Sequence, residues 1–303
     1  METQELYMEY RPLLFTLAYR MLGSVMDAED VVQGTFLAFA GVGEERKEQV
    51  SNVQAYLCKM ATNRCLDLLR SAKHRREVYV GTWLPEPVVL REEQEVDEPL
   101  YELLRRDDLS TAYLMLMETL SPEERAIFVL REAYQYSYAE ISEHVAKGEA
   151  NCRKIYSRIK IKLGPQLADA RADYHQDLAT LNRFLAAFAA GDVDQLLELL
   201  SADVTLYSDG GGKATAAIRP IVSAPHVLAF LQGVAAKSGP DSSVELVTIN
   251  GQPGLLFLTG GQVHTTLCFR QKAGRMQNIY LMRNPDKLAA IGVNLYNGKE
   301  KQS

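Results

Sequence analysis

The sequence predicts a multidomain protein in which two all-α helical segments precede an α+β domain. Apolar side chains recur at helical spacing over the first 165 residues, whereas after residue 200 they form short strand-like runs bounded by glycine turns. Residues 50–80 carry six basic and two acidic side chains (net +4), and residues 147–163 carry six and one (net +5). Residues 85–110, between them, carry three basic and nine acidic side chains (net −6). This charge partition indicates two DNA-contacting modules joined by an acidic linker.

Composition limits the class of protein. With 47% hydrophobic and 24% charged residues, the chain has ordinary globular composition. No run approaches the roughly 18 apolar residues that cross a bilayer, and the N-terminal METQELYMEYR lacks the apolar core of a signal peptide. We therefore expect a cytoplasmic protein with no membrane partner. Neither a CxxC pair nor histidines at metal-ligand spacing accompany the cysteines, so we expect no metal or other cofactor and four buried free thiols: Cys58, Cys65, Cys152 and Cys268.

The first 80 residues predict a helical hairpin followed by one long helix. Gly23 and Ser24 interrupt the apolar pattern, and Asp27 is expected to begin the second helix with acids in its first turn, although a solvated helix start explains those acids equally well. The long helix spans residues 51–76. Its outward face mixes amide, carboxylate and basic groups that can contact bases and phosphates: Asn63, Arg64, Asp67, Arg70 and Lys73.

Residues 121–163 carry the pattern of a helix-turn-helix. SPEE at Ser121 and SYAE at Ser137 each match a capping box, with Glu124 and Glu140 at the third helical position. Gly148 is expected to supply the tight turn before the third helix. That helix would bury its apolar side and expose Arg153, Lys154, Arg158 and Lys162, as a recognition helix does in the major groove. A plain helical bundle with a basic face is the alternative.

After residue 174 the pattern predicts helices and then a curved antiparallel sheet. An amphipathic helix, a turn at Gly191-Asp192 and a short second helix come first, and a further helix is expected at residues 225–236. The expected strands are residues 204–207, 244–249, 254–258, 263–270 and 276–282. Two loops stand out. The glycines of DGGGK allow close approach of another segment or an anion, and NPDKL precedes a final helix, although simple turns explain both.

These segments resemble the extracytoplasmic-function (ECF) RNA polymerase sigma factors. DAEDVVQGTFLAF is similar to their region-2 helix that docks on polymerase, and AYLCKMATNRCLDLLRSAKHRRE to the segment that melts and reads the downstream promoter element. LSPEERAIFVLREAYQYSYAEISEHVAKGEANCRKIYSRIKIKL is similar to the region-4 helix-turn-helix that reads the upstream element. The resemblance implies promoter-specific transcription initiation, with core RNA polymerase and promoter DNA as partners.

The resemblance implies roles for particular residues. Polymerase contacts would fall on Asp27, Asp30, Val31 and Gln33. DNA contacts would fall on Asn63, Arg64, Asp67, Arg70, Arg75 and Arg76 in the first basic stretch and on Arg153, Lys154 and Arg158 in the second. Two positions depart from the family pattern: Gly34 replaces a usual Glu, and Gly148 replaces the Ser or Thr that caps the recognition helix.

The C-terminal part resembles the SnoaL-like, NTF2-like cone fused to a subgroup of these sigma factors. That subgroup carries WLPEP in the linker together with DGGGK and NPDKL. The corresponding residues are Trp83, Leu84, Pro85, Glu86 and Pro87; Asp209, Gly210, Gly211, Gly212 and Lys213; and Asn284, Pro285, Asp286, Lys287 and Leu288. The predicted domains are residues 1–80, the linker 81–110, residues 111–165 and the cone 171–297.

The resemblance implies that the fused domain regulates the sigma factor in cis, in place of a separate anti-sigma protein. We hypothesise that Trp83 to Pro87 docks near the two loops, because a lone indole between stiff prolines is a good anchor. The cone also implies a pocket for a small hydrophobic ligand. Two alternatives stay open: a ligand-sensing helix-turn-helix repressor, or a cyclase or isomerase using Asp209, His226 or His264.

Overall fold

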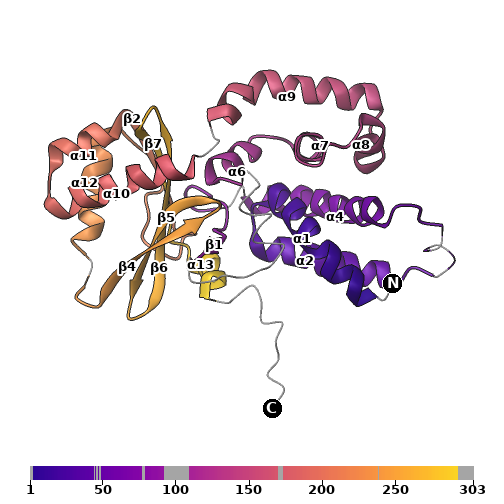
Figure 1. Cartoon of the computed structure of the whole chain (residues 1–303), viewed down its shortest axis with the longest axis horizontal. Helices are drawn as coiled ribbons and strands as arrows, with labels where there is room; N and C mark the ends of the chain where they lie inside the picture. Colours follow the sequence, from indigo (N-terminus) through magenta and orange to yellow (C-terminus); the bar gives the residue numbers. More distant parts are fainter. Residues whose placement is uncertain are drawn as a thin grey trace, which may run out of the picture. The chain divides into compact units, whose positions relative to one another are not determined.

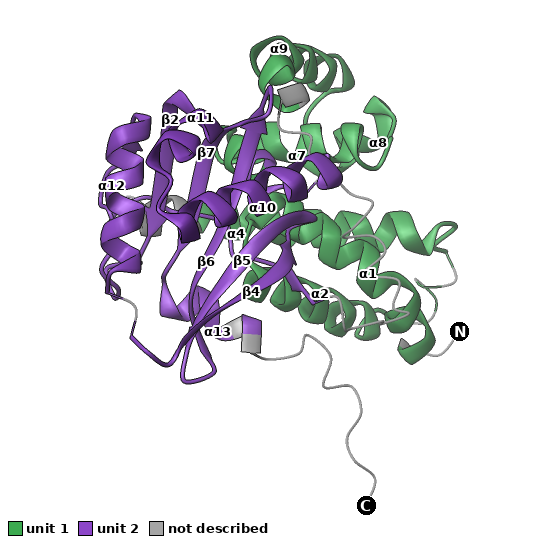
Figure 2. Cartoon of the chain, turned by 60° about the vertical axis from the view of Figure 1, so that its left-hand side comes forward, with its two compact units in different colours: residues 1–78, 97–106, 114–168 green, residues 79–96, 107–113, 169–303 purple. Residues whose placement is uncertain are grey.

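The computed structural model describes residues 3–43, 45, 47, 49–76, 79–91, 109–169, 173–237 and 239–292. The chain divides into two compact units, coloured separately in Figure 2. Unit 1 comprises residues 1–78, 97–106 and 114–168, and unit 2 comprises residues 79–96, 107–113 and 169–303. The two predicted helical domains thus form one unit, and the WLPEP segment belongs to unit 2. Most of the acidic stretch, residues 92–108, lies outside the described residues.

The first part of unit 1 contains the helices α1 (Thr3–Leu22), α2 (Val25–Ala40) and α4 (Val53–Arg76). They pack side by side (Figure 1) around fully buried Phe15 and Tyr19. Ser24 caps α2, and its Oγ accepts a hydrogen bond from the Asp27 backbone N–H at 3.1 Å. The helix therefore begins two residues before the expected Asp27, because a Ser hydroxyl satisfies a donor that the first turn leaves without an intrahelical partner.

The second part of unit 1 holds α7 (Pro122–Glu132), α8 (Tyr138–Val145) and α9 (Glu149–Asp169). Both predicted capping boxes are confirmed, Ser121 with Glu124 and Ser137 with Glu140. The expected turn at Gly148 is wrong. Ala146 carries the left-handed conformation, with φ 51°. Gly148 instead precedes α9, where its carbonyl accepts hydrogen bonds from the backbone of the helix's first turn.

Unit 2 is an α+β structure with one seven-stranded sheet. Its helices are α10 (Tyr174–Ala190), α11 (Val193–Leu199), α12 (Ala224–Ala235) and α13 (Pro285–Gly292). Its strands are β1 (Val89–Leu90), β2 (Leu200–Asp209), β3 (Ile221–Val222), β4 (Ser242–Ile249), β5 (Gln252–Thr259), β6 (Gln262–Lys272) and β7 (Arg275–Met282). A further helix, α6 (Thr111–Met117), crosses the boundary between the units in sequence.

The sheet order is β1-β4-β5-β6-β7-β2-β3. All neighbours pair antiparallel except β2 and β7, which pair parallel. The five expected strands and the helix at residues 225–236 are therefore present, in a mixed rather than purely antiparallel sheet. Two short edge strands were not expected. One of them, β1, comes from the linker and pairs with β4.

Each face of the central strands is covered by a different part of unit 2. On one face α10, α11 and α12 (Figure 1) pack on alternate sheet residues such as Leu267, Phe269 and Ile279. The intervening residue Cys268 contacts Thr111 at 3.2 Å from Sγ to Oγ1. Because successive side chains of a strand point to opposite faces, Thr111 lies on the second face of the sheet. Helix α13 also packs against β6.

The predicted free thiols are confirmed, since Cys58, Cys65, Cys152 and Cys268 are all buried and unbridged. Burial raises the pKa of Cys268 to about 12, so the thiol is protonated and inert. Among the described residues no group of three or more His, Cys, Asp or Glu could hold a metal ion. None of the helices in that part of the chain combines the length and apolar character that crossing a membrane requires.

Candidate nucleic-acid interface and linker-docking site

Asp209, the last residue of β2, is the centre of a buried polar cluster in unit 2. It is 0% exposed. Its Oδ1 accepts hydrogen bonds from the Tyr79 hydroxyl (2.6 Å) and the Gly211 N–H (3.0 Å). Its Oδ2 accepts from the Leu84 N–H (2.9 Å) and the Lys287 ammonium (2.8 Å). Four donors thus satisfy one buried carboxylate, two of them from the segment 79–91, which we call the strap.

Lys287 holds the strap from the other side. Its ammonium donates to the Leu84 carbonyl at 2.6 Å, so both backbone groups of Leu84 are bonded to the Asp209–Lys287 ion pair. The same ammonium lies 4.3 Å from the centre of the Trp83 ring, within cation–π range. Lys287 is 7% exposed and Leu84 is 1% exposed. The WLPEP segment is therefore in contact with both the DGGGK and the NPDKL motifs.

The three glycines of DGGGK allow this close packing. A Cβ at Gly210 would overlap the Ala214 carbonyl, and one at Gly211 would overlap the Asn284 side chain. Gly212 has φ +72°, and a Cβ there would lie 3.3 Å from Val80 of the strap. The sequence predicted that these glycines allow the close approach of either another chain segment or an anion. The structure shows the close approach of other chain segments.

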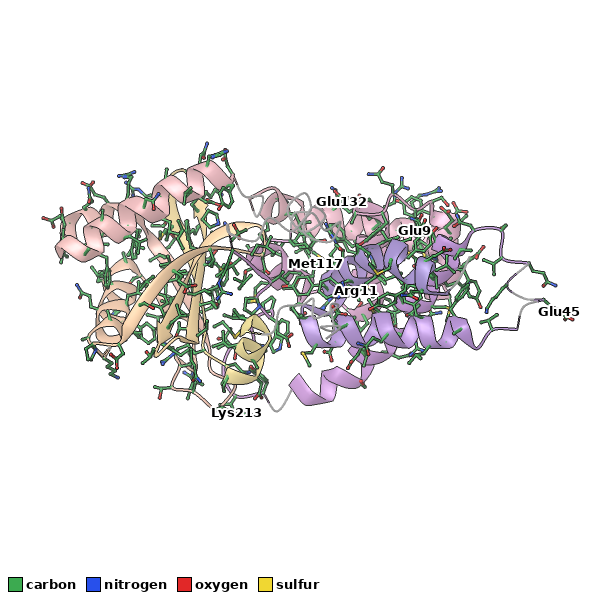
Figure 3. All side chains as sticks on the ribbon, turned by 60° about the horizontal axis from the view of Figure 1, so that its bottom comes forward. Glu9, Arg11, Glu45, Met117, Glu132 and Lys213 are labelled. Atoms are coloured by element: carbon green, nitrogen blue, oxygen red, sulfur yellow. The ribbon has the colours of Figure 1, made fainter. Side chains whose placement is uncertain are left out.

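NPDKL contributes a second set of contacts. The Asn284 amide donates to the Tyr79 hydroxyl at 3.0 Å, and its Oδ1 accepts from the Asp286 N–H at the start of α13. Burial, followed by the hydrogen bond and charge of Asp209, raises the pKa of Tyr79, so the phenol stays a neutral donor. Lys213, labelled in Figure 3, forms an ion pair with Asp286, and the two side chains are 58% and 62% exposed.

Asn250 anchors the far end of the strap and was missed by sequence reasoning. Its Oδ1 accepts from the Val88 N–H, and its own N–H donates to the Val88 carbonyl, both at 2.9 Å. Its Nδ2 donates to Thr111 Oγ1 at 3.2 Å. From the sequence, Asn250-Gly251 predicted a turn and nothing about contacts with the strap. Tyr79 carried no signal at all, because it lies just before the recognised motif.

In unit 1, α9 exposes the predicted basic residues Arg153, Lys154 and Arg158 and buries Cys152 and Ile159. Two contacts position Arg153: an ion pair with Glu149 at 2.8 Å, and the face of Tyr138 at 5.2 Å. Glu132, labelled in Figure 3, accepts from the Tyr156 hydroxyl at 2.6 Å and so ties α9 to α7. The basic face of α9 is therefore presented on a braced helix.

The predicted DNA-facing strip of α4 is partly engaged within unit 1. Asn63, Asp67 and Arg70 are exposed, but the Arg70 guanidinium bonds Glu123 of α7 at 2.9 Å as well as Asp67 at 3.4 Å. Lys59 pairs with Glu143 of α8 at 3.5 Å. The side chains of Lys73, Arg75 and Arg76 lie outside the described residues.

Arg64 does not lie fully in solvent. Its guanidinium rests against Gly34 of α2, where a Cβ would lie 2.9 Å from Nη1. The departure of Gly34 from the family pattern thus makes room for an arginine expected to contact DNA.

The outer face of α2 carries an exposed row that includes two of the four predicted polymerase contacts. Asp30 and Gln33 are exposed and lie between Met26 (60% exposed) and Leu37 (75% exposed), at spacings of four, three and four residues that fall on one helix face. Asp27 is exposed beside this row. Val31, the remaining predicted polymerase contact, is 2% exposed and packs inward, so its side chain is not accessible on this face. Sequence reasoning missed Met26 and Leu37, although exposed large apolar residues at helical spacing mark a binding face.

Comparison with known proteins identifies the family to which these helices belong. Residues 6–75 match the Sigma-70 region 2 family and residues 110–163 match the Sigma-70 region 4 family. The ECF RNA polymerase sigma factor SigJ of Mycobacterium tuberculosis is 33% identical over 289 residues, which cover 91% of this chain and 90% of SigJ. The chain belongs to the ECF RNA polymerase sigma factors.

The likeness extends over nearly the whole length of this sigma factor. The crystal structure of M. tuberculosis SigJ superposes with a TM-score of 0.76 at 29% identity, covering 95% of this chain and 98% of SigJ. A probable ECF sigma factor of the same organism, SigI, is 26% identical over 95% of this chain and 96% of its own. Neither family match extends beyond residue 163, whereas these relatives also align with the part of unit 2 that follows it.

The comparison confirms the resemblance drawn from the sequence motifs. The region 2 match spans α1, α2 and α4, and the region 4 match spans α6 to α8 and most of α9. In this sigma factor the Asp209 cluster lies beyond both matches and binds a strap that lies between them.

Proposed function

We propose that unit 2 regulates this sigma factor in cis by binding the strap that joins its two promoter-reading regions. The observation that carries the proposal is the double hydrogen bonding of Leu84 to the buried Asp209–Lys287 pair. A strap held at Tyr79, Leu84 and Val88 has a fixed path over unit 2. Release of the strap would free the remainder of the linker to adopt another path.

Core RNA polymerase is the proposed partner of α2. The row of Met26, Asp30, Gln33 and Leu37, with Asp27 beside it, offers carboxylates and an amide between two exposed apolar side chains. That mixture is typical of a protein interface, in which an apolar centre is surrounded by polar groups. Val31 would support this face from inside the unit.

Promoter DNA is the proposed ligand of α9 and α4. Arg153, Lys154 and Arg158 would enter the major groove of the upstream element, where arginine reads guanine and lysine contacts phosphate. Asn63, Asp67 and Arg70 would handle the downstream element. The ion pairs of Arg70 with Glu123 and of Lys59 with Glu143 occupy part of this surface. Binding of the downstream element would therefore have to break contacts that α4 makes with α7 and α8.

The experiment is promoter-specific run-off transcription with core polymerase. We would compare the intact chain, a chain ending after Leu163, and the strap variants Trp83→Ala and Lys287→Met, with Lys213→Met as the matched control. The strap variants and the truncation should change transcript yield at least severalfold in the same direction, and the control should leave it unchanged. Unchanged yield from both strap variants would show that strap docking has no regulatory role.

The cavity of unit 2 supports ligand binding rather than turnover. It has a volume of about 960 Å³ and is lined mainly by apolar side chains. Of the three residues considered as catalytic, His264 lines it, whereas Asp209 is occupied by four donors and His226 bonds Ser223 at the surface. No Asp or Glu is among the described lining residues, so a general acid or base in this cavity would have to be His264 or Lys237.

A further inference from the structure

The cavity of unit 2, hereafter the cone cavity, is large and apolar. It lies between α10, α12 and the inner face of strands β4 to β7, and four phenyl rings line it: Phe184, Phe188, Phe230 and Phe257. Its volume of about 960 Å³ is at the upper end of the range typical of small-molecule sites. An occupant with a large apolar body would fit it.

Positive charge is concentrated at the wall of the cone cavity. Arg283 and Lys237 line it, and the described lining residues include no Asp or Glu to balance these two cations. One guanidinium nitrogen of Arg283 donates to the Thr215 carbonyl, while its Nε is buried without a hydrogen-bond partner. Cations at the wall of an apolar cavity are costly to leave without a counter-charge, which is a reason to expect an anionic occupant.

His264 supports this view of the local charge. Burial, and then the positive charge of Arg283, lowers the pKa of His264. The imidazole therefore stays neutral near pH 7, and Arg283 is the fixed charge at this end of the cavity. His264 Nδ1 lies 2.9 Å from Thr265 Oγ1, which lines the same wall.

We propose that the cone cavity binds an amphipathic organic anion, with its apolar body among the phenyl rings and its carboxylate against Arg283. A carboxylate can accept from two guanidinium nitrogens at once, which is the strongest common mode of pairing for arginine. Binding of this kind would supply the missing negative charge. The sequence predicted a pocket for a small hydrophobic ligand; the proposal adds that this ligand carries a negative charge.

Because of the position of Arg283, ligand binding can affect the docking of the strap. This consequence rests on the proposed function. The Arg283 backbone N–H donates to the Asp209 carbonyl at 2.7 Å, and Asn284 follows directly. Thr215, which accepts from the Arg283 side chain, follows the DGGGK loop. An anion that draws the guanidinium away from Thr215 would act on both motifs that hold Leu84.

The binding test uses two fluorescent probes that differ by one anionic group, with the full chain and no polymerase. The probes are 8-anilinonaphthalene-1-sulfonate and its uncharged counterpart N-phenyl-1-naphthylamine. Arg283→Gln should weaken binding of the sulfonate about tenfold and leave the neutral probe within twofold. Arg275→Gln removes an exposed arginine at the start of β7, the strand that Arg283 follows; it is the matched control and should change neither. Equal effects of Arg283→Gln on both probes, or no effect, would overturn the proposal.

A second measurement needs only the unaltered chain and covers the case in which Arg283→Gln does not fold. Bound N-phenyl-1-naphthylamine is titrated with decanoate and with 1-decanol. We expect saturable displacement by decanoate at a concentration no higher than that of the alcohol. Displacement by decanol alone would show a site for neutral ligands and overturn the proposal. Because neither assay involves transcription, anion binding can be established even if cis regulation fails.

Discussion

At the scale of single residues, the buried pair of Asp209 and Lys287 has the largest structural consequence. Both side chains are nearly inaccessible, at 0% and 8% exposed, and each also bonds the strap backbone. Removing one member of such a pair leaves an uncompensated buried charge, which is much worse than removing both. The surface pair of Lys213 and Asp286 belongs to the same two motifs and provides a direct comparison.

We predict that Lys287→Met destabilises unit 2 by about 3–5 kcal/mol, because Asp209 loses its counter-charge in a buried site. Lys213→Met should change stability by less than about 1 kcal/mol, since exposed pairs contribute little. Urea unfolding followed by Trp83 fluorescence measures both. The double variant Asp209→Asn with Lys287→Met should recover part of the loss. A loss equal to that of Lys213→Met would mean that the pair is not buried in solution.

A second residue-scale prediction concerns His144 in α8, which is 6% exposed. Burial, and then the charge of Lys59, lowers its pKa to about 4, from an ordinary value near 6.5. Above pH 6.5 both the folded and unfolded states hold a neutral imidazole, so the full stability is present. Between pH 6.5 and 4 the unfolded chain takes up a proton that the folded chain does not, and stability falls until both states are protonated.

Unit 1 should therefore lose about 1–2 kcal/mol between pH 7 and pH 5 through this residue. Urea unfolding followed by far-ultraviolet circular dichroism at the two pH values measures the change. His144→Gln should reduce the dependence, and His226→Gln, on the surface of unit 2, serves as the control. The same pH dependence in all three proteins would assign the effect to other groups.

At the scale of elements, local sequence patterns predicted the helices and strands, but they did not predict the hydrogen bonds that hold the strap. Capping boxes, apolar periodicity and Gly-containing turns are local signals, and they placed α7, α8, β4 and β7 within a few residues. The parallel pairing of β2 with β7 joins segments some seventy residues apart and has no local signal. Tyr79 and Asn250 likewise act through long-range hydrogen bonds. The left-handed residue at Ala146 shows that the turn geometry before α9 overrode the preference for glycine.

The contact between α4 and α7 gives an element-scale prediction. Burial acts to raise the pKa of Glu123, but the hydrogen bond from Arg70 and nearby positive charges outweigh it and the pKa is lowered. The carboxylate is therefore charged near pH 7 and holds Arg70. If this contact competes with binding, Glu123→Gln should strengthen binding of core polymerase and promoter DNA about two- to fivefold, the range expected for a partly exposed pair.

Titration of labelled sigma factor with core polymerase and a promoter fragment measures the change, and it should shrink as salt screens the pair. Glu198→Gln removes an exposed carboxylate of α11 in unit 2, away from the strap, and is the control. Weaker binding by Glu123→Gln would show instead that Glu123 helps to form the competent arrangement.

At the scale of the whole molecule, the division into two units predicts two unfolding transitions. Trp83 is the only tryptophan in the chain, and its ring lies against Lys287 inside unit 2. Fluorescence therefore reports on unit 2, whereas far-ultraviolet circular dichroism contains a large contribution from the helices of unit 1. Units that unfold as separate cooperative bodies give curves that do not coincide when followed by these two probes.

The strap makes this prediction specific. Lys287→Met should move the fluorescence transition to lower urea and leave the circular dichroism change that belongs to unit 1 at its original midpoint. Lys213→Met should leave both in place. Addition of decanoate should move the fluorescence transition in the opposite direction, because a ligand that binds only the folded cone cavity stabilises the unit that contains it. Coincident curves that shift together in Lys287→Met would instead show that the strap couples the stabilities of the two units, so that its release affects the promoter-reading helices directly.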